Sequence, residues 1–262
     1  MPSDIVRKFP DVDIKHLYDD SIINKPNSFA SVLYNAMIHP IKNFTYKGVI
    51  WYQGESNRNN PVLYKDLFIT FVNELRILLE NKNLPFYYTQ IAPYSYGDSN
   101  GLNGTLIREV QYESEKLIPN VGMAVLMDIG DENCIHPAEK EKVGERLAYL
   151  ALNHTYKIES IPSDAPRYSS FELKDNSVIV SFDIAPLGIT SYGKPLQLFE
   201  IAGEDGVFYK AEAQIVARSK VKIWSEKVNN PYEVRYAFKN FVIGDLFGVN
   251  GIPVSSFRFK LK

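Results

Sequence analysis

The chain has 262 residues, enough for one large domain or two small ones, and its 45% hydrophobic and 23% charged residues are ordinary for a globular protein. A net charge of -2 gives no electrostatic reason to expect nucleic acid or an anionic membrane surface as a partner. No apolar run reaches transmembrane length, and the four histidines and one cysteine show no zinc-type spacing and allow no internal disulfide. We therefore expect no membrane partner, no metal and no other cofactor.

The first part of the chain alternates predicted helices and strands after an irregular segment over residues 1–27. Apolar residues at helical spacing predict a first helix over 28–41, with Ser28 as its N-cap. The elements that follow are a strand over 47–52, a helix over 61–81, a strand over 85–92, a helix over 106–117, a strand over 121–127 and a helix over 137–153. This βαβαβα alternation predicts a parallel sheet with both faces covered, which we assign to an α/β domain over 28–160.

The pattern changes after a linker at 158–166 that is rich in proline and serine. Beyond it we find no helical periodicity, and short alternating stretches separated by turn residues predict antiparallel strands. These strands cover 171–173, 177–182, 196–201, 212–216, 221–224, 233–238 and 257–261. We therefore expect a second, antiparallel β domain over 165–262, folded as a sandwich or a jelly roll.

The strand over 47–52 ends abruptly in polar residues. Its apolar run stops at Tyr52, and Gln53-Gly54-Glu55-Ser56-Asn57 follow directly. In an α/β sheet, ligands bind outside the carboxyl ends of the strands. A strand end that carries two amides, a carboxylate and a hydroxyl is therefore a candidate active site.

A second strand end carries a histidine. The apolar run over 121–127 leads into several acids and then His136, and Pro137 suits the first turn of the next helix. In a parallel sheet, His136 and the turn over 53–57 would lie at the same edge. An imidazole beside carboxylates and amide donors is typical of general-base acyl transfer.

The residues of the first turn each have a functional and a structural interpretation. The Gln53 amide could donate to an oxyanion or to the substrate, or it could only stabilise the turn. Gly54 could supply a backbone N–H donor or simply permit the turn, and Asn57 is a further candidate for binding the oxyanion or the substrate. Glu55 could orient His136 or brace its own loop, and we leave both interpretations open.

Three further residues favour structural interpretations. Ser56 lacks the second flanking glycine of a G-x-S-x-G nucleophile turn, because position 58 is an arginine. For Cys134 we favour a small hydrophobe over a thiol nucleophile. Arg108 could hold a sugar carboxylate with two hydrogen bonds, but we favour a structural role for an arginine within a helix.

Four sequence blocks stand out when they are taken together. They are Trp51-Tyr52-Gln53-Gly54-Glu55-Ser56-Asn57, Arg108-Glu109-Val110-Gln111, Asp128-Ile129-Gly130-Asp131 with Ile135-His136-Pro137, and Pro231-Tyr232-Glu233-Val234-Arg235-Tyr236. With their surroundings, over about 28–260, they resemble the sialate O-acetylesterases and related carbohydrate acetylesterases of the SGNH-hydrolase superfamily. The resemblance implies a three-layer, flavodoxin-like α/β fold, incomplete at its N-terminus here, followed by an antiparallel β domain.

The resemblance also implies an activity. It implies removal of acetyl esters from an O-acetylated sugar by serine-type acyl transfer, in a full-length protein that is periplasmic or secreted. His136 would be the general base, taking the proton of the serine and later protonating the leaving sugar hydroxyl. The family's serine lies in a G-Q-S-N-like turn after the first sheet strand, and residues 1–27 contain no such turn.

We therefore expect the chain to be the C-terminal part of a longer esterase and nearly inactive alone. Its expected partner is the missing N-terminal part of the same protein. A non-catalytic carbohydrate-binding or assembly module is the alternative, which the retained 53–57 and His136 blocks disfavour.

The acid that would orient His136 is left open. The resemblance implies an aspartate three residues before the histidine, where this chain has Asn133. In some relatives a backbone carbonyl takes this place. The remaining candidates are Asp131, Asp128 and Glu132, with a shifted loop geometry, and Glu55 from the other strand end.

Overall fold

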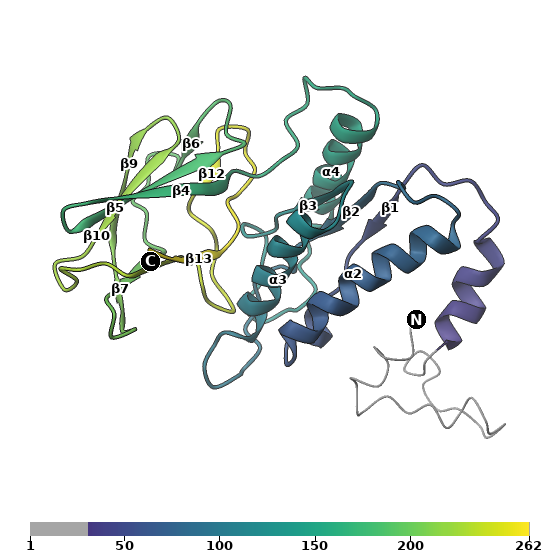
Figure 1. Ribbon diagram of the computed structural model, residues 1–262, viewed down its shortest axis with the longest axis horizontal. Coiled ribbons are helices and arrows are strands. Elements are labelled where there is room, and N and C mark those ends of the chain that lie inside the picture. The colour runs from purple at the N-terminus through teal and green to yellow at the C-terminus, as the bar shows by residue number, and fades with distance from the viewer. Residues whose placement is uncertain (1–30, 262) are drawn as a thin grey trace.

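The computed structural model describes residues 31–261, and Figure 1 shows them as two parts that lie side by side. The first part is built on a sheet of three parallel strands in the order β1-β2-β3. These are β1 (Val49–Trp51), β2 (Phe86–Thr89) and β3 (Val121–Ala124). The predicted parallel sheet is therefore confirmed, with each strand shorter than its predicted range.

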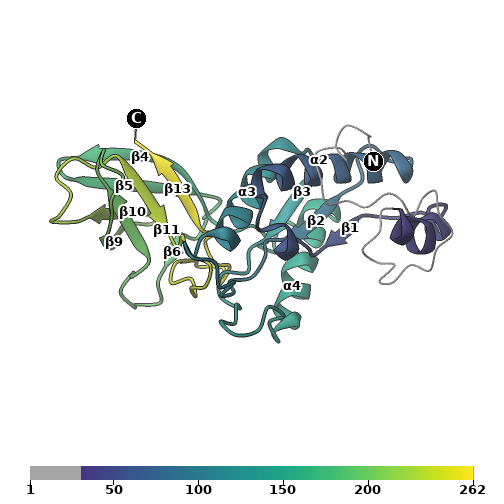
Figure 2. The same cartoon turned by 90° about the horizontal axis from the view of Figure 1, so that it is seen from below.

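Helices cover both faces of this sheet, so the first part has three layers. Its long helices are α2 (Pro61–Leu78), α3 (Asn103–Leu117) and α4 (Lys140–Leu150). Figure 2 shows α2 and α3 on one side of the sheet and α4 on the other. Alternation along β2 explains this arrangement: Phe86 and Tyr88 pack in the cluster under α2 and α3, whereas Tyr87 packs with the apolar side of α4.

The prediction that Pro137 opens a helix is wrong. The helix begins at Lys140, and Pro137 lies in an irregular loop before it. Asp131 explains part of the difference, because its carboxylate accepts the backbone N–H groups of Asn133 and Cys134. Such local bonds from a side chain to the backbone compete with a helix.

The helix predicted over 28–41 falls partly outside the described residues, and Ser28 lies outside with it. The described portion is the π-helix η3 (Tyr34–Ile38) followed by the 3-10 turn η4 (His39–Ile41). Pro40 within η4 has no backbone N–H to donate, which disfavours a continuous α-helix there. At the other end of the sheet, α4 continues into a second π-helix, η6 (Ala151–Thr155).

The second part is antiparallel, and no helix occurs among its described residues, 165–261. Two four-stranded sheets have the orders β4-β5-β10-β9 and β13-β11-β7-β8, beside a small pair β12-β6. The strands are β4 (Arg167–Lys174), β5 (Ser177–Asp183), β6 (Ile189–Thr190), β7 (Phe199–Ala202), β8 (Phe208–Lys210), β9 (Glu212–Ala217), β10 (Lys220–Trp224), β11 (Glu233–Tyr236), β12 (Phe247–Gly248) and β13 (Phe257–Lys260). Every predicted strand is confirmed, whereas β6, β8 and β12 are too short for alternation to reveal them.

Helix α3 joins the two parts through buried polar contacts. Arg108 is fully buried and donates to the carbonyl oxygens of Lys239 and Asn240 and to the hydroxyl of Ser256. Around it, one hydrophobic cluster runs from α2 and α3 into the β part. The α/β fold with an antiparallel β part is thus confirmed, while a division into separate domains near 160–165 stays a prediction. None of the helices within 31–261 has both the length and the apolar character needed to cross a membrane.

Candidate active site

Three loops meet at the carboxyl edge of the parallel sheet. They follow β1, β2 and β3 and comprise residues 52–60, 90–102 and 125–139. In the middle loop, Ser95 donates its backbone N–H to the carbonyl of Glu132 in the third loop at 3.4 Å. The turn over 53–57 and the loop of His136 therefore share one edge, on either side of the middle loop. That both can touch one reacting centre stays a prediction.

The turn after β1 is closed by its own groups. Gln53 Nε2 donates to Asn57 Oδ1 at 2.6 Å, and the Asn57 backbone N–H donates to the Gly54 carbonyl at 2.9 Å. Residues Glu55–Asn57 form a single 3-10 turn, η5. The Gln53 amide has a second N–H that no described residue accepts, so it can both stabilise the turn and donate to a ligand.

A buried glutamine from α3 fixes this turn from behind. Gln111 is 1% exposed, its Nε2 donates to the Gln53 carbonyl at 3.1 Å, and its Oε1 accepts the Ile91 N–H at 2.9 Å. The Tyr64 hydroxyl on α2 donates to the same Gln53 carbonyl at 3.0 Å. One side chain thus ties the loops after β1 and β2 together. The sequence placed Gln111 in a block of the family resemblance but indicated no role for it.

Close packing explains the glycine at position 54. A Cβ there would lie 2.8 Å from Ile91 Cγ2 and 3.0 Å from Gln111 Nε2. The carbon–carbon separation is well inside van der Waals contact, so a side chain would push the turn away from the middle loop. Gly54 is buried, and its backbone N–H has no acceptor among residues 31–261, so this N–H is a candidate donor to a ligand.

The loop of His136 is exposed, and its acids bind other groups. The His136 side chain makes no hydrogen bond within 31–261, and the Cys134 thiol donates to its backbone carbonyl rather than to the ring. Asp128 binds Arg146 through two bonds of 2.7 Å. Asp131 caps its own loop through backbone N–H groups. Which acid orients His136 therefore stays a prediction.

Glu55 lies among tyrosines on the other side of the edge. Burial, and then the charge of Glu55, raises the pKa of Tyr52 to about 12. The same two causes raise the pKa of Tyr96, whose hydroxyl is buried without a hydrogen-bond partner in the described part. These neighbours fit the interpretation of Glu55 as a brace of its own loop, and no described contact joins it to His136.

Two cations not singled out from the sequence lie over aromatic rings at this edge. Arg58 Cζ lies 5.0 Å from the centroid of the Tyr96 ring, and Lys140 Nζ lies 4.7 Å from that of Tyr52. Each pair joins different loops or elements, so spacing along the chain could not reveal it. The Lys140–Tyr52 contact brings the start of α4, four residues after His136, against the end of β1.

Two residues weighed from the sequence have structural surroundings. Arg108 is buried in the contact between the two parts, and burial lowers its pKa to about 10, so the guanidinium stays protonated at neutral pH. A sugar carboxylate does not reach this position. Ser56 is exposed, and its hydroxyl has no hydrogen-bond partner within 31–261 that could activate it.

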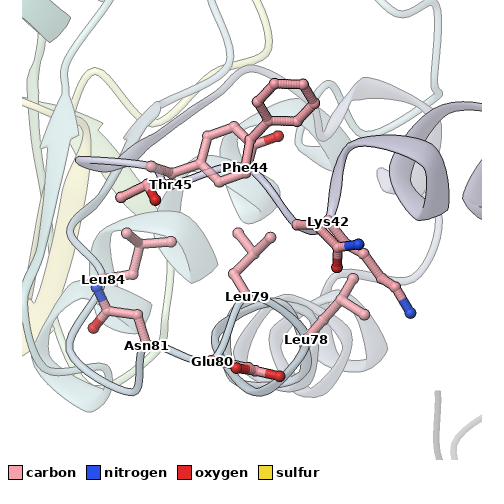
Figure 3. A pocket seen from close by; sticks show the side chains of 10 residues that line it. Lys42, Phe44, Thr45, Leu78, Leu79, Glu80, Asn81 and Leu84 are labelled. Atoms are coloured by element: carbon pink, nitrogen blue, oxygen red, sulfur yellow. The ribbon is translucent and has the colours of Figure 1, made fainter.

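A separate pocket of about 660 Å³ lies at the opposite edge of the sheet, near the amino ends of β1 and β2. Figure 3 shows its wall, which combines the segment before β1 with the end of α2. The residues labelled there are Lys42, Phe44, Thr45, Leu78, Leu79, Glu80, Asn81 and Leu84. The pocket contains no histidine and lies at the edge where α/β sheets do not bind ligands, so we place the candidate active site at the carboxyl edge instead.

Comparison with known families decides the relationship of this chain. The model of the family described as "carbohydrate esterase, sialic acid-specific acetylesterase" matches residues 21–153, more than half of the sequence. The chain belongs to this family. The resemblance found from the sequence blocks is therefore confirmed.

Relatives of this carbohydrate esterase chain include much longer proteins. It is 33% identical to the sialate O-acetylesterase of Mus musculus and 34% identical to that of Homo sapiens, over 160 residues each. These matches cover 55% of the chain but 30% and 31% of the two relatives, so the chain spans less than a third of their length.

A solved structure extends the likeness to both parts of the molecule. A carbohydrate acetylesterase from Xanthomonas citri superposes with a TM-score of 0.83 at 34% identity. The superposition covers 96% of this chain and 58% of that protein. That protein thus shares the β part of this chain as well as its α/β part.

Proposed function

We propose that this chain forms the histidine and oxyanion-binding side of a carbohydrate O-acetylesterase site, and that the nucleophilic serine lies outside residues 31–261. One observation carries the proposal: three groups suited to acyl transfer lie at one sheet edge with no hydrogen-bond partner among residues 31–261. They are the Gly54 N–H, the second N–H of Gln53 and the imidazole of His136. Membership of a carbohydrate esterase family supports sugar acetyl esters as the substrate class.

The proposed reaction follows serine-type acyl transfer. The serine oxygen attacks the acetyl carbonyl carbon while His136 takes the hydroxyl proton. The carbonyl oxygen becomes an oxyanion, which the Gly54 N–H and the Gln53 amide stabilise. Collapse breaks the bond between the acetyl carbon and the sugar oxygen, and His136 returns the proton to that oxygen. A water molecule then attacks the acetyl-serine by the same route and releases acetate.

The hydrogen bonds that each acid already makes bear on which of them could orient His136. Asp128 is disfavoured, because both of its oxygens bind Arg146. Asp131 uses one oxygen for its own loop and keeps the other, so it is our first candidate. Glu132 and Glu55 remain alternatives.

A non-catalytic carbohydrate-binding module is the less well supported function. Such a module gains nothing from an exposed imidazole beside unpaired amide donors. The relatives from Mus musculus, Homo sapiens and Xanthomonas citri are all esterases by name.

Hydrolysis of 4-nitrophenyl acetate and of O-acetylated sialic acid tests the proposal. The purified chain should show almost no turnover, because loss of the nucleophile leaves only about 10³–10⁴-fold acceleration from binding and oxyanion stabilisation. A form of the chain extended at its N-terminus to include a serine turn should turn over, and His136→Ala should abolish that gain. Turnover by the chain alone that is lost in Ser56→Ala would show that Ser56 is the nucleophile after all. Full activity of the extended His136→Ala variant would contradict the role of His136.

A further inference from the structure

The guanidinium of Arg58 is only partly paired and lies beside the candidate active site. It directly follows η5, and its Nη1 donates to the Glu55 carbonyl at 3.2 Å. No other hydrogen bond and no carboxylate reaches this side chain from within 31–261. Its Nε and Nη2 therefore have no acceptor in the described part of the chain, although the residue is half-buried. A planar guanidinium with free donors matches the geometry of a carboxylate.

Other arginines in the described part are committed to structure. Arg76 and Arg108 are buried and donate to backbone carbonyls. Carboxylates hold four more, namely Arg146, Arg167, Arg235 and Arg258. Arg218 is bound only by the Pro186 carbonyl, but it lies in the β part. Among the arginines that the structure describes, Arg58 is thus the one with free donors at the carboxyl edge of the parallel sheet.

Tyr96 holds this guanidinium in place. Arg58 Cζ lies 5.0 Å from the Tyr96 ring centroid, and Tyr94 packs edge-on against the same ring at 4.9 Å. The ring also lies against Gly104 at the start of α3, where a Cβ would come within 2.5 Å of it. A guanidinium stacked on a fixed ring loses less freedom when it binds an anion. The free donors of Arg58 are therefore preorganised where the first and middle loops meet.

We infer that Arg58 binds the carboxylate of an acidic sugar through two parallel N–H···O hydrogen bonds and so determines the substrate class of the edge site. The inference rests on the proposed function for the position of the acetyl ester. Binding of the sugar acid itself needs no nucleophile. Glu55 opposes an anion by its charge, whereas Lys140 on Tyr52 favours one. The planar guanidinium of Arg58, rather than the net charge of the edge, distinguishes an acidic sugar from a neutral one.

A matched pair of ligands isolates this discrimination. Calorimetric titration of the full chain would compare N-acetylneuraminic acid with its methyl ester, which has the same sugar ring but no charge. We expect the acid to bind at least about tenfold more tightly at low salt, in keeping with hydrogen bonds between charged groups. Arg58→Gln should remove that preference, and Arg58→Lys should keep only part of it. Arg218→Gln is the control and should leave the preference intact.

Three results would overturn the inference. They are equal binding of acid and ester, a preference that survives in a folded Arg58→Gln variant, and no binding of the acid. Tyr96→Phe, which keeps the ring under Arg58, should retain the preference, and its loss there would also contradict the stacking argument. The proposed esterase function fails separately: an extended protein that hydrolyses neutral and acidic sugars alike contradicts only Arg58, whereas an acid-selective protein without turnover contradicts only the esterase.

Discussion

The two halves of the candidate active site are built in opposite ways. The turn over 53–57 is held from behind by Gln111 and Tyr64, which are buried side chains of two helices. The loop of His136 has an exposed run over 131–134 and is capped by one of its own carboxylates. The first half is thus positioned by buried side chains of the core. In the second half, Arg146 of α4 holds only the start of the loop at Asp128, and the exposed run depends on the Asp131 carboxylate and one bond from Ser95 to Glu132.

This difference separates two kinds of functional group. Donors that must stabilise an oxyanion gain from a fixed position, because they then need no reorganisation during the reaction. A general base must instead contact its nucleophile, and the His136 side chain makes no hydrogen bond within 31–261. Under the proposed function, this chain supplies donors in fixed positions for the oxyanion and a general base whose nucleophile lies outside residues 31–261.

Loss of Arg108 should have the largest effect, because it removes a buried charged donor from the contact between the two parts of the molecule. Arg108→Met would remove three hydrogen bonds from a charged donor, to the carbonyls of Lys239 and Asn240 and to the Ser256 hydroxyl. The Asn240 carbonyl and the Ser256 hydroxyl keep a second donor each. We expect the free energy of unfolding to fall by about 3–5 kcal/mol, since a hydrogen bond to a charged group contributes roughly 1.5–3 kcal/mol. Urea denaturation measures this.

Arg258→Met is the matched control for that experiment. Arg258 joins the same two parts, but its ion pair with Glu109 is partly exposed. Its loss should cost less than about 1 kcal/mol. Equal losses in the two variants would show that Arg108 is no special support.

Gln111 and Asp131 compare the two halves directly. Gln111→Met leaves the buried Ile91 N–H without an acceptor and should cost about 2–3 kcal/mol. Asp131→Ala removes an exposed cap and should cost about 1 kcal/mol or less. Thermal and urea unfolding of both variants checks the order, and a larger loss for Asp131→Ala would reverse the comparison.

Two glycines should respond with opposite signs. Gly54→Ala would force a Cβ to 2.8 Å from Ile91 and should cost about 1–3 kcal/mol through overpacking. Gly144 lies within α4 with no atom within 4 Å of the added Cβ, so Gly144→Ala should stabilise the protein by about 0.5–1 kcal/mol. Melting temperatures of the two variants measure both changes, and a neutral Gly54→Ala would show that the turn is not fixed.

A paired histidine offers the smallest effect and a contrast with His136. A hydrogen bond that His154 Nε2 donates to the Asp164 carboxylate raises the pKa of His154 above its ordinary 6.5. Burial alone would raise the pKa of Asp164, but hydrogen bonds with His154 and Ser163 outweigh it and lower the pKa below its ordinary 3.8. The protonated histidine thus stabilises the fold below pH 6.5 and loses that contribution as pH rises through its raised pKa.

Asp164 sets the lower pH limit of the range in which this pair stabilises the fold. Its contribution is present above pH 3.8 and is lost as pH falls through its lowered pKa, so the pair stabilises most between pH 3.8 and 6.5. His154→Gln should therefore lower the free energy of unfolding there by at most about 1 kcal/mol, since the pair is partly exposed, and by less at higher pH. A loss that grows as pH rises above 6.5 would contradict this assignment.

Sequence patterns predicted the elements better than their ends. Runs of apolar residues located all three parallel strands, because a strand that is covered on both faces must be apolar. The helix after His136 starts at Lys140 instead of Pro137, because a side chain of the loop competes for the backbone. Such competition depends on three-dimensional geometry that spacing does not encode.

The candidate site was predictable as a place but not as a set of contacts. The strand ends indicated Gln53 and His136, and parallel pairing then puts both at one edge. The Gln111 brace and the Arg58–Tyr96 stack join residues tens of positions apart, so no local pattern could show them. The same distance in sequence concealed the burial of Arg108.

Hydrogen exchange of the full chain, followed residue by residue, tests the contrast between the two halves most directly. We predict that the amides of Ile91 and Asn57, bonded to Gln111 and to the Gly54 carbonyl, exchange at least about 100-fold more slowly than those of Asn133 and Cys134. Similar exchange rates in the two loops would contradict the inference that the turn over 53–57 is held more rigidly than the exposed run before His136.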